Sequence, residues 1–106
     1  MIWEKVKTLE DRLGQLKKEI EEIEKELEGL PSGHLEIKRI NGNSYYYLRY
    51  WEDGKLKSRY IGRFANDIES KLLKAEELRR KLTQLKEEEK RLSNIISKIE
   101  RFLSNY

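Results

Sequence analysis

The 106-residue chain contains no cysteine, one histidine and one proline. The lack of cysteine excludes disulfides and thiolate metal sites, and a lone His34 cannot form the imidazole cluster that zinc requires. The glutamate runs at 21–22 and 87–89 fall on expected helix faces, so no two carboxylates are placed across a cleft for acid–base chemistry. We therefore expect no enzyme, no metal or cofactor site and no small-molecule substrate.

Long apolar runs are also lacking. No window approaches the roughly 18 uncharged residues of a membrane helix, and the first residues form no apolar leader core. Asp, Glu, Lys and Arg make up 41% of the chain, which leaves little material for a large globular core. We expect a cytoplasmic protein with no membrane partner, one elongated domain over residues 1–106, and a composition typical of thermophilic proteins.

A strict heptad pattern occupies residues 2–30. Apolar side chains recur at alternating spacings of four and three residues from Ile2 to Leu30, which is the pattern of a coiled-coil seam. Gly29 and Pro31 then predict the end of the helix, because glycine favours the position after the last turn and proline cannot continue it.

A second heptad pattern predicts a helix over residues 66–105. Its seam runs from Ile68 to Tyr106 and is interrupted by two polar residues, Lys71 and Glu89. The two seams match as an antiparallel hairpin in two registers, in which paired residue numbers add to 98 or to 105. The longer register would leave Ile68 and Leu72 to pack beneath the central sheet, and the seams alone do not choose between the two.

The first register leaves the end of the second helix beyond the start of the first. Nothing in the same chain would bury the apolar residues there, so we expect a symmetric homodimer. The residues expected to form its contact are Trp3, Ile99, Phe102, Leu103 and Tyr106.

Residues 34–63 predict a three-stranded antiparallel sheet inserted at the closed end of the hairpin. Asn41-Gly42 and Asp53-Gly54 are the dipeptides that favour two-residue hairpin turns, and aromatic and β-branched residues fill the segments around them. The fold class is therefore α+β: a long antiparallel coiled-coil hairpin carrying a β-meander.

The turn at Asp53-Gly54 fixes which side chains share a face of this sheet. It places Tyr47 opposite Tyr60 and predicts an exposed face of aromatic and basic residues. The other face, with Leu48 at its centre, should pack on the start of the second helix, and Phe64 should close the corner. The exposed face comprises Lys38, Tyr45, Tyr47, Arg49, Trp51, Ser58 and Tyr60.

Residues 34–63 also concentrate positive charge, with seven basic and three acidic side chains and a net charge of +4. Aromatic rings interleaved with arginine can stack on bases and contact phosphates. We therefore expect nucleic acid as the partner, bound by the exposed face together with Lys55, Lys57, Arg59 and Arg63. By strand alternation Lys57, Arg59 and Arg63 lie on the opposite face, so they would have to reach round the edge. The alternative is that tyrosine and tryptophan are simply good strand residues and that the edge cations prevent aggregation.

Three resemblances accompany these residues. The Tyr-Tyr-Tyr, Gly-Lys and Ser-Arg-Tyr elements between Ser44 and Arg63 resemble a family of small uncharacterised prokaryotic proteins, whose Cys-containing segment is missing here. Tyr60-Ile61-Gly62-Arg63-Phe64 before a helix is similar to AP2-type and integrase arm-binding modules, which implies DNA contact by Tyr60. The layout of helix, β segment and returning helix resembles prefoldin subunits, which implies a chaperone with apolar tips at residues 1–3 and 102–106.

From these observations we expect a non-catalytic nucleic-acid-binding homodimer, with DNA favoured over RNA. The alternative is a prefoldin-like chaperone or a structural coiled-coil scaffold that does not bind nucleic acid.

Overall fold

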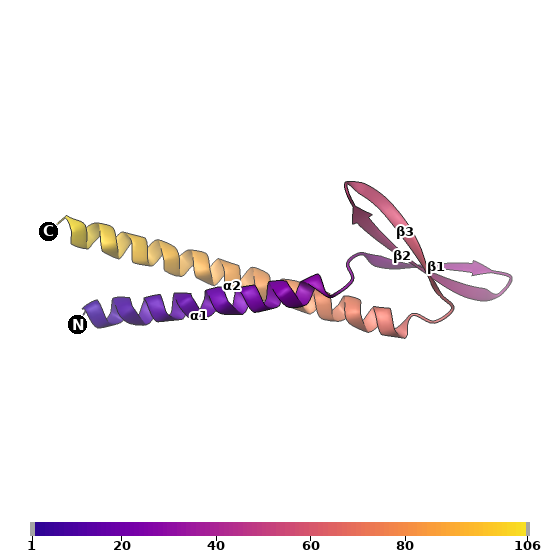
Figure 1. The fold of residues 1–106 in the computed structure, drawn as a ribbon, viewed down its shortest axis with the longest axis horizontal. Coiled ribbons are helices and arrows are strands. Elements are labelled where there is room, and N and C mark those ends of the chain that lie inside the picture. Colours follow the sequence, from indigo (N-terminus) through magenta and orange to yellow (C-terminus); the bar gives the residue numbers. More distant parts are fainter. Residues whose placement is uncertain (1, 106) are drawn as a thin grey trace. The chain divides into compact units, whose positions relative to one another are not determined.

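The computed structural model describes residues 2–105 and contains two helices and three strands (Figure 1). The elements are α1 (Ile2–Glu28), β1 (His34–Ile40), β2 (Asn43–Glu52), β3 (Lys55–Gly62) and α2 (Asn66–Ser104). The α+β class and the expected order of elements are confirmed. The chain divides into two compact units, a helical unit of residues 1–26 and 78–106 and a sheet unit of residues 27–77. Among the described residues, no helix has an apolar stretch long enough to cross a bilayer.

In the helical unit, two ion pairs join the antiparallel helices. Arg12 Nε lies 3.2 Å from Glu88 Oε1, and Lys86 Nζ lies 3.8 Å from Glu24 Oε1. These residue numbers add to 100 and 110, so the two pairs straddle the register of 105. In the register of 98, Glu24 and Lys86 would be twelve residues out of step, about 18 Å at 1.5 Å per residue. The Glu24–Lys86 pair therefore selects the longer register, whereas the Arg12–Glu88 pair fits either one.

The Arg12–Glu88 pair is also doubly hydrogen-bonded. Arg12 Nε and Nη2 donate to the two carboxylate oxygens of Glu88, each at 3.2 Å. The hydrogen bond to Glu88 raises the pKa of Arg12 above its ordinary value. Both side chains remain partly exposed, so the pair contributes little to stability.

The predicted seam is the core of the helical unit. Leu16 is fully buried, and the other buried side chains also occupy seam positions. They are Val6, Ile20, Ile23, Leu85 and Ile96. Six buried apolar side chains at heptad positions confirm the coiled-coil interpretation.

The apolar overhang expected at the end of α2 is wrong. In the register of 105, Leu103 is level with Ile2, so the helices end together, and Ile99 is half-buried within the unit. The first turn of α1 and the last turn of α2 lie at the same end of this unit (Figure 1). Tyr106, the last residue of the expected dimer contact, lies outside the described residues.

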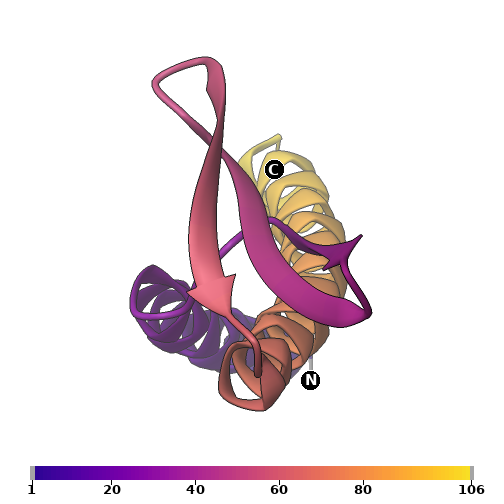
Figure 2. The same ribbon diagram turned by 90° about the vertical axis from the view of Figure 1, so that its right-hand side faces the viewer.

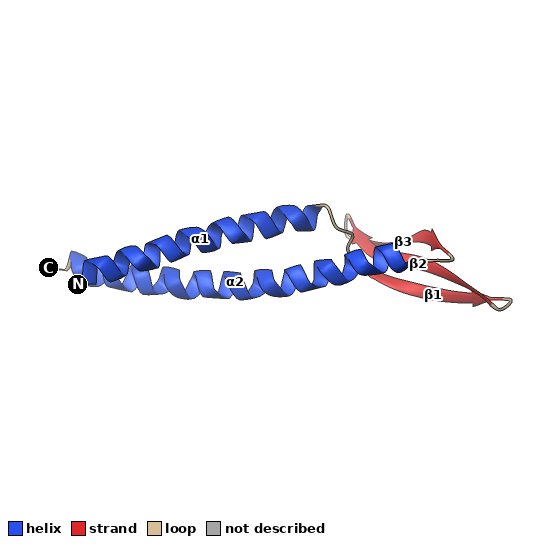
Figure 3. Ribbon diagram, turned by 90° about the horizontal axis from the view of Figure 1, so that it is seen from below, coloured by secondary structure: helices blue, strands red, loops and turns tan. Residues whose placement is uncertain are grey.

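In the sheet unit, β2 lies between β1 and β3, and the strands form a twisted antiparallel meander (Figures 2 and 3). Both predicted turns are confirmed, because Asn41-Gly42 and Asp53-Gly54 have φ values of 51°, 80°, 52° and 73°. Two positive φ values in succession define the type I′ turn that matches the twist of a hairpin. The expected partners Tyr47 and Tyr60 pair directly.

One irregularity interrupts the β2–β3 pairing. Tyr46 pairs with Gly62 while Tyr47 pairs with Tyr60, so Ile61 is an extra residue in a β-bulge. The expectation that strict alternation continues to Arg63 is therefore wrong, because the bulge shifts the alternation by one residue beyond Ile61.

The face of the sheet that was predicted to be buried is covered at its centre, whereas Ile37 on the same face is 54% exposed. Leu48 is 3% exposed, and its neighbours Tyr46 and Tyr50 on the same face are half-buried. Phe64 does not close the corner, since 86% of it is exposed. The buried position in this connection belongs instead to the small Ala65, which leaves Phe64 at the rim of a cavity.

Candidate nucleic-acid interface

Three tyrosine rings cluster on the face of the sheet that was predicted to be exposed; Tyr60 is exposed, and Tyr45 and Tyr47 are half-buried. The centroid of Tyr60 lies 5.2 Å from that of Tyr47 and 6.4 Å from that of Tyr45. These distances lie in the range of favourable aromatic pairs. Together with Ile40 the rings line a shallow hollow of about 280 Å³. We call the face that carries this cluster the tyrosine face; its residues are His34, Glu36, Lys38, Ile40, Asn43, Tyr45, Tyr47, Arg49, Trp51, Leu56, Ser58 and Tyr60.

Two cations flank the ring cluster. Lys38, which pairs with Tyr45, places its Nζ 4.6 Å from the centroid of the Tyr47 ring. Arg63 follows the bulge, and its Nη2 donates a hydrogen bond of 2.9 Å to Asn43 Oδ1. Because Asn43 belongs to the tyrosine face, the bulge brings Arg63 to the side opposite the one that alternation predicted. A lysine has three donors and an arginine five, so each can also contact a phosphate.

Arg49, the arginine at the centre of the predicted site, forms an ion pair with Glu36. Its Nη1 lies 3.3 Å and 3.5 Å from the two carboxylate oxygens of Glu36, and its Nε is buried without a partner. Glu36 also lies 3.7 Å from His34 Nε2. Sequence reasoning missed Glu36, although its position opposite Tyr47 places it on the same face as Arg49.

The other residues predicted to bind nucleic acid lie on both faces of the sheet. Trp51 is 70% exposed and lies opposite Leu56, and Ser58 lies opposite Arg49, all on the tyrosine face. Lys57 and Arg59 belong to the other face, as expected, and Lys55 lies on that face too. Lys57 forms an ion pair of 3.2 Å with Glu52. The structure thus brings together seven predicted residues and Arg63, and it separates three basic residues from them.

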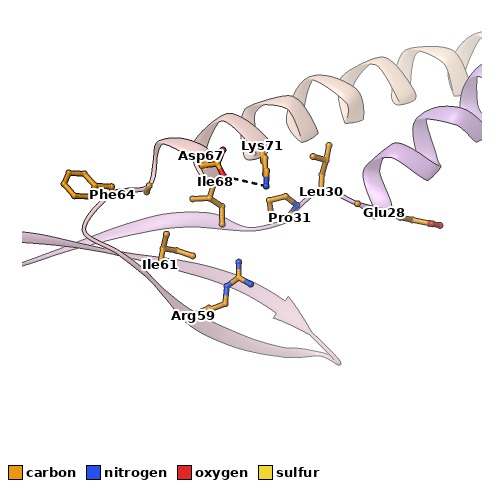
Figure 4. A pocket seen from close by; sticks show the side chains of 11 residues that line it. Glu28, Leu30, Pro31, Arg59, Ile61, Phe64, Asp67, Ile68 and Lys71 are labelled. Carbon is orange, nitrogen blue, oxygen red and sulfur yellow. Dashed lines mark ion pairs between the residues drawn. The ribbon is translucent and has the colours of Figure 1, made fainter.

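A larger cavity of about 530 Å³ lies on the opposite side of the sheet unit (Figure 4). Leu30 and Ile68 line it, with Arg59 and Ile61 from β3 and Phe64 at the rim. Asp67 and Lys71 form an ion pair of 3.8 Å at its edge. Within residues 2–105, no three His, Asp or Glu side chains are grouped to hold a metal ion.

Comparison with protein families gives one match. A family model described as a domain of unknown function (DUF6788) matches residues 7–70, which is 64 of the 106 residues. The matched segment contains all three strands and therefore the whole tyrosine face. No curated protein and no solved structure matches the chain.

Proposed function

The chain belongs to the DUF6788 family, whose description assigns no activity, and we therefore propose a function from the site alone: non-catalytic binding of nucleic acid by the tyrosine face. The observation that carries this proposal is the ring cluster of Tyr45, Tyr47 and Tyr60 with a cation on either side. Rings supply surfaces on which bases stack, and cations neutralise phosphates.

The charge of the sheet supports the same proposal. Residues 34–63 carry a net charge of +4, although the helices on either side are rich in glutamate. Positive charge in one part of a chain attracts a polyanion and raises its rate of encounter. DNA and RNA both carry these bases and phosphates, and DNA is the first ligand to test.

We expect the double substitution Lys38→Ala and Arg63→Ala to weaken nucleic-acid binding, because it removes both cations beside the rings. Binding would be measured by fluorescence anisotropy at about 50 mM salt with labelled duplex DNA, single-stranded DNA and RNA. The matched control is Lys17→Ala with Lys90→Ala, which removes the same charge from exposed positions in the helical unit. A variant that binds as the control does would contradict the assignment of the site. Failure of the wild-type protein to bind any of the three, with the sheet intact by circular dichroism, would overturn the proposed function.

We also propose that the protein forms a homodimer through the end of the helical unit. Ile2 and Trp3 are 54% and 69% exposed, and Phe102 and Leu103 are 57% and 39% exposed. The register of 105 brings these four apolar residues to one end of the helix pair, where a second copy can cover them. The prefoldin-like alternative would use the same end to hold an unfolded chain.

We expect Trp3→Ser combined with Leu103→Ser to shift the protein from dimer to monomer in sedimentation velocity, because the change removes apolar area from the contact. Leu73→Ser is the control, since Leu73 is 57% exposed but lies in the sheet unit. A wild-type protein that stays monomeric at high micromolar concentration would overturn the dimer. Suppression of client aggregation by such a monomer would favour the chaperone alternative.

A further inference from the structure

We propose that the tyrosine face selects single-stranded over double-stranded nucleic acid, with unpaired bases stacked on the rings and phosphates held by Lys38 and Arg63. This inference depends on the proposed function and narrows it to a class of ligand. Three features of the face lead to it: the exposure of the rings, the pairing of Arg49, and the number and position of the remaining cations.

The exposed rings contact the part of a base that a duplex hides. Tyr60 is 53% exposed and Trp51 is 70% exposed, so each ring presents surface to solvent. In a duplex each base is covered above and below by its neighbours, and only its edges are accessible in the grooves. In a single strand the flat surface of a base is free, and it stacks on an aromatic ring with little dependence on sequence.

The arginine at the centre of the face, Arg49, is already paired within the sheet. An arginine that donates two hydrogen bonds to guanine is the commonest specific contact in the major groove. Arg49 occupies the centre of the face, but its Nη1 is paired with Glu36 and its Nε is buried. The carboxylate of Glu36 also repels any phosphate that approaches this half of the face. Groove reading would first have to break the Arg49–Glu36 pair.

The two remaining cations suit a strand that crosses the sheet over the rings. Lys38 belongs to one edge strand, Arg63 follows the other, and the tyrosine cluster lies between them. Two strand spacings separate the edges, a width of about 10 Å. A single strand that crosses the sheet in this direction meets Lys38 at one edge and Arg63 at the other. These two cations neutralise about two of its phosphates. Binding should therefore fall with the logarithm of salt concentration at a slope of about −1.4, since each phosphate of a single strand contributes about −0.7.

Equilibrium binding of one nucleotide sequence in three forms tests the proposal: single-stranded DNA, single-stranded RNA and duplex DNA. We expect both single strands to bind at least about 10-fold more tightly than the duplex, and Tyr60→Ala to weaken the single-strand complex by about 5- to 150-fold. Tyr60→Phe keeps the ring and is the matched comparison, which should retain most of the affinity that Tyr60→Ala loses. The salt slope should stay the same in Tyr60→Ala and become shallower by about 0.7 in Lys38→Ala.

The outcomes separate this inference from the proposed function. Equal or tighter binding of the duplex would overturn single-strand selection and leave nucleic-acid binding in place. Equal losses in Tyr60→Phe and Tyr60→Ala would overturn stacking. A proline-rich peptide is included because aromatic grooves also bind polyproline helices. Binding of that peptide, with no binding of any nucleic acid, would overturn both.

Discussion

Replacing Leu16 by alanine is expected to lower the free energy of unfolding by about 2–5 kcal/mol. Leu16 has no exposed surface, and it is level with Glu89 in the register of 105. The substitution removes buried methyl and methylene groups in the middle of the seam and leaves a cavity that two rigid helices close poorly. Urea denaturation followed by circular dichroism at 222 nm would measure the change, because the far-ultraviolet signal of this chain is mainly helical.

Leu73→Ala is the matched control for this prediction. It makes the same change on α2 at a position that is 57% exposed, and it should alter stability by no more than about 0.5 kcal/mol. A loss below about 1 kcal/mol in Leu16→Ala would contradict the central place of this residue in the packing.

Replacing Gly33 by alanine is expected to destabilise the sheet unit by about 2–5 kcal/mol. Gly33 has a φ of 112°, which an L-residue with a side chain rarely adopts. A Cβ at this position would overlap the backbone carbonyl of Arg49 and touch Tyr50 Cβ. Neither obstacle is the end of a flexible side chain, so the backbone itself would have to move. Thermal unfolding followed at a wavelength that reports the tyrosine environment would measure the change.

Substitutions at two other glycines distinguish the two causes of this loss, which are backbone strain and steric overlap. Gly14→Ala has open space around the new Cβ and lies within α1, so it should stabilise the helical unit by about 1 kcal/mol. Gly42→Ala also meets no atom, but its φ of 80° imposes strain alone. A loss in Gly33→Ala no larger than that in Gly42→Ala would show that the overlap with Arg49 does not matter.

The sequence predicts the elements of this fold well because each is encoded locally. Heptad spacing defines both helices, and Asn41-Gly42 and Asp53-Gly54 define the two turns and therefore the pairing of all three strands. The helix register could not be predicted from the seams, since both registers match apolar positions with apolar positions. The charged pair that distinguishes the two registers, Glu24 with Lys86, lies outside the apolar seam.

The candidate site was predicted in part. Strand alternation placed Tyr45, Tyr47 and Tyr60 on one exposed face, and the ring distances confirm that they cluster. Strand alternation placed Arg63 on the wrong face, because the bulge at Ile61 adds a residue that hydrophobic periodicity does not reveal. Gly62 is the one signal in the sequence, since a glycine within a strand often marks a bulge. The pairing of Arg49 with Glu36 was missed because basic and aromatic residues alone were assigned to the face.

The short turns of the sheet have a consequence for the order of folding. Each hairpin closes through two residues, and such local pairings form within about 1–10 μs, whereas α1 must wait for a partner more than fifty residues away in the chain. The residues that enter and leave the sheet, Leu30 and Ile68, line the same cavity once the strands have paired. The entropy cost of bringing the two helices together grows with the length of the flexible connection between them. A sheet that forms early shortens this flexible connection and so lowers that cost. We therefore expect the strands to fold first and the two helices to pair afterwards. Substitutions in the turns should then slow folding, whereas substitutions in the seam far from the sheet should mainly speed unfolding.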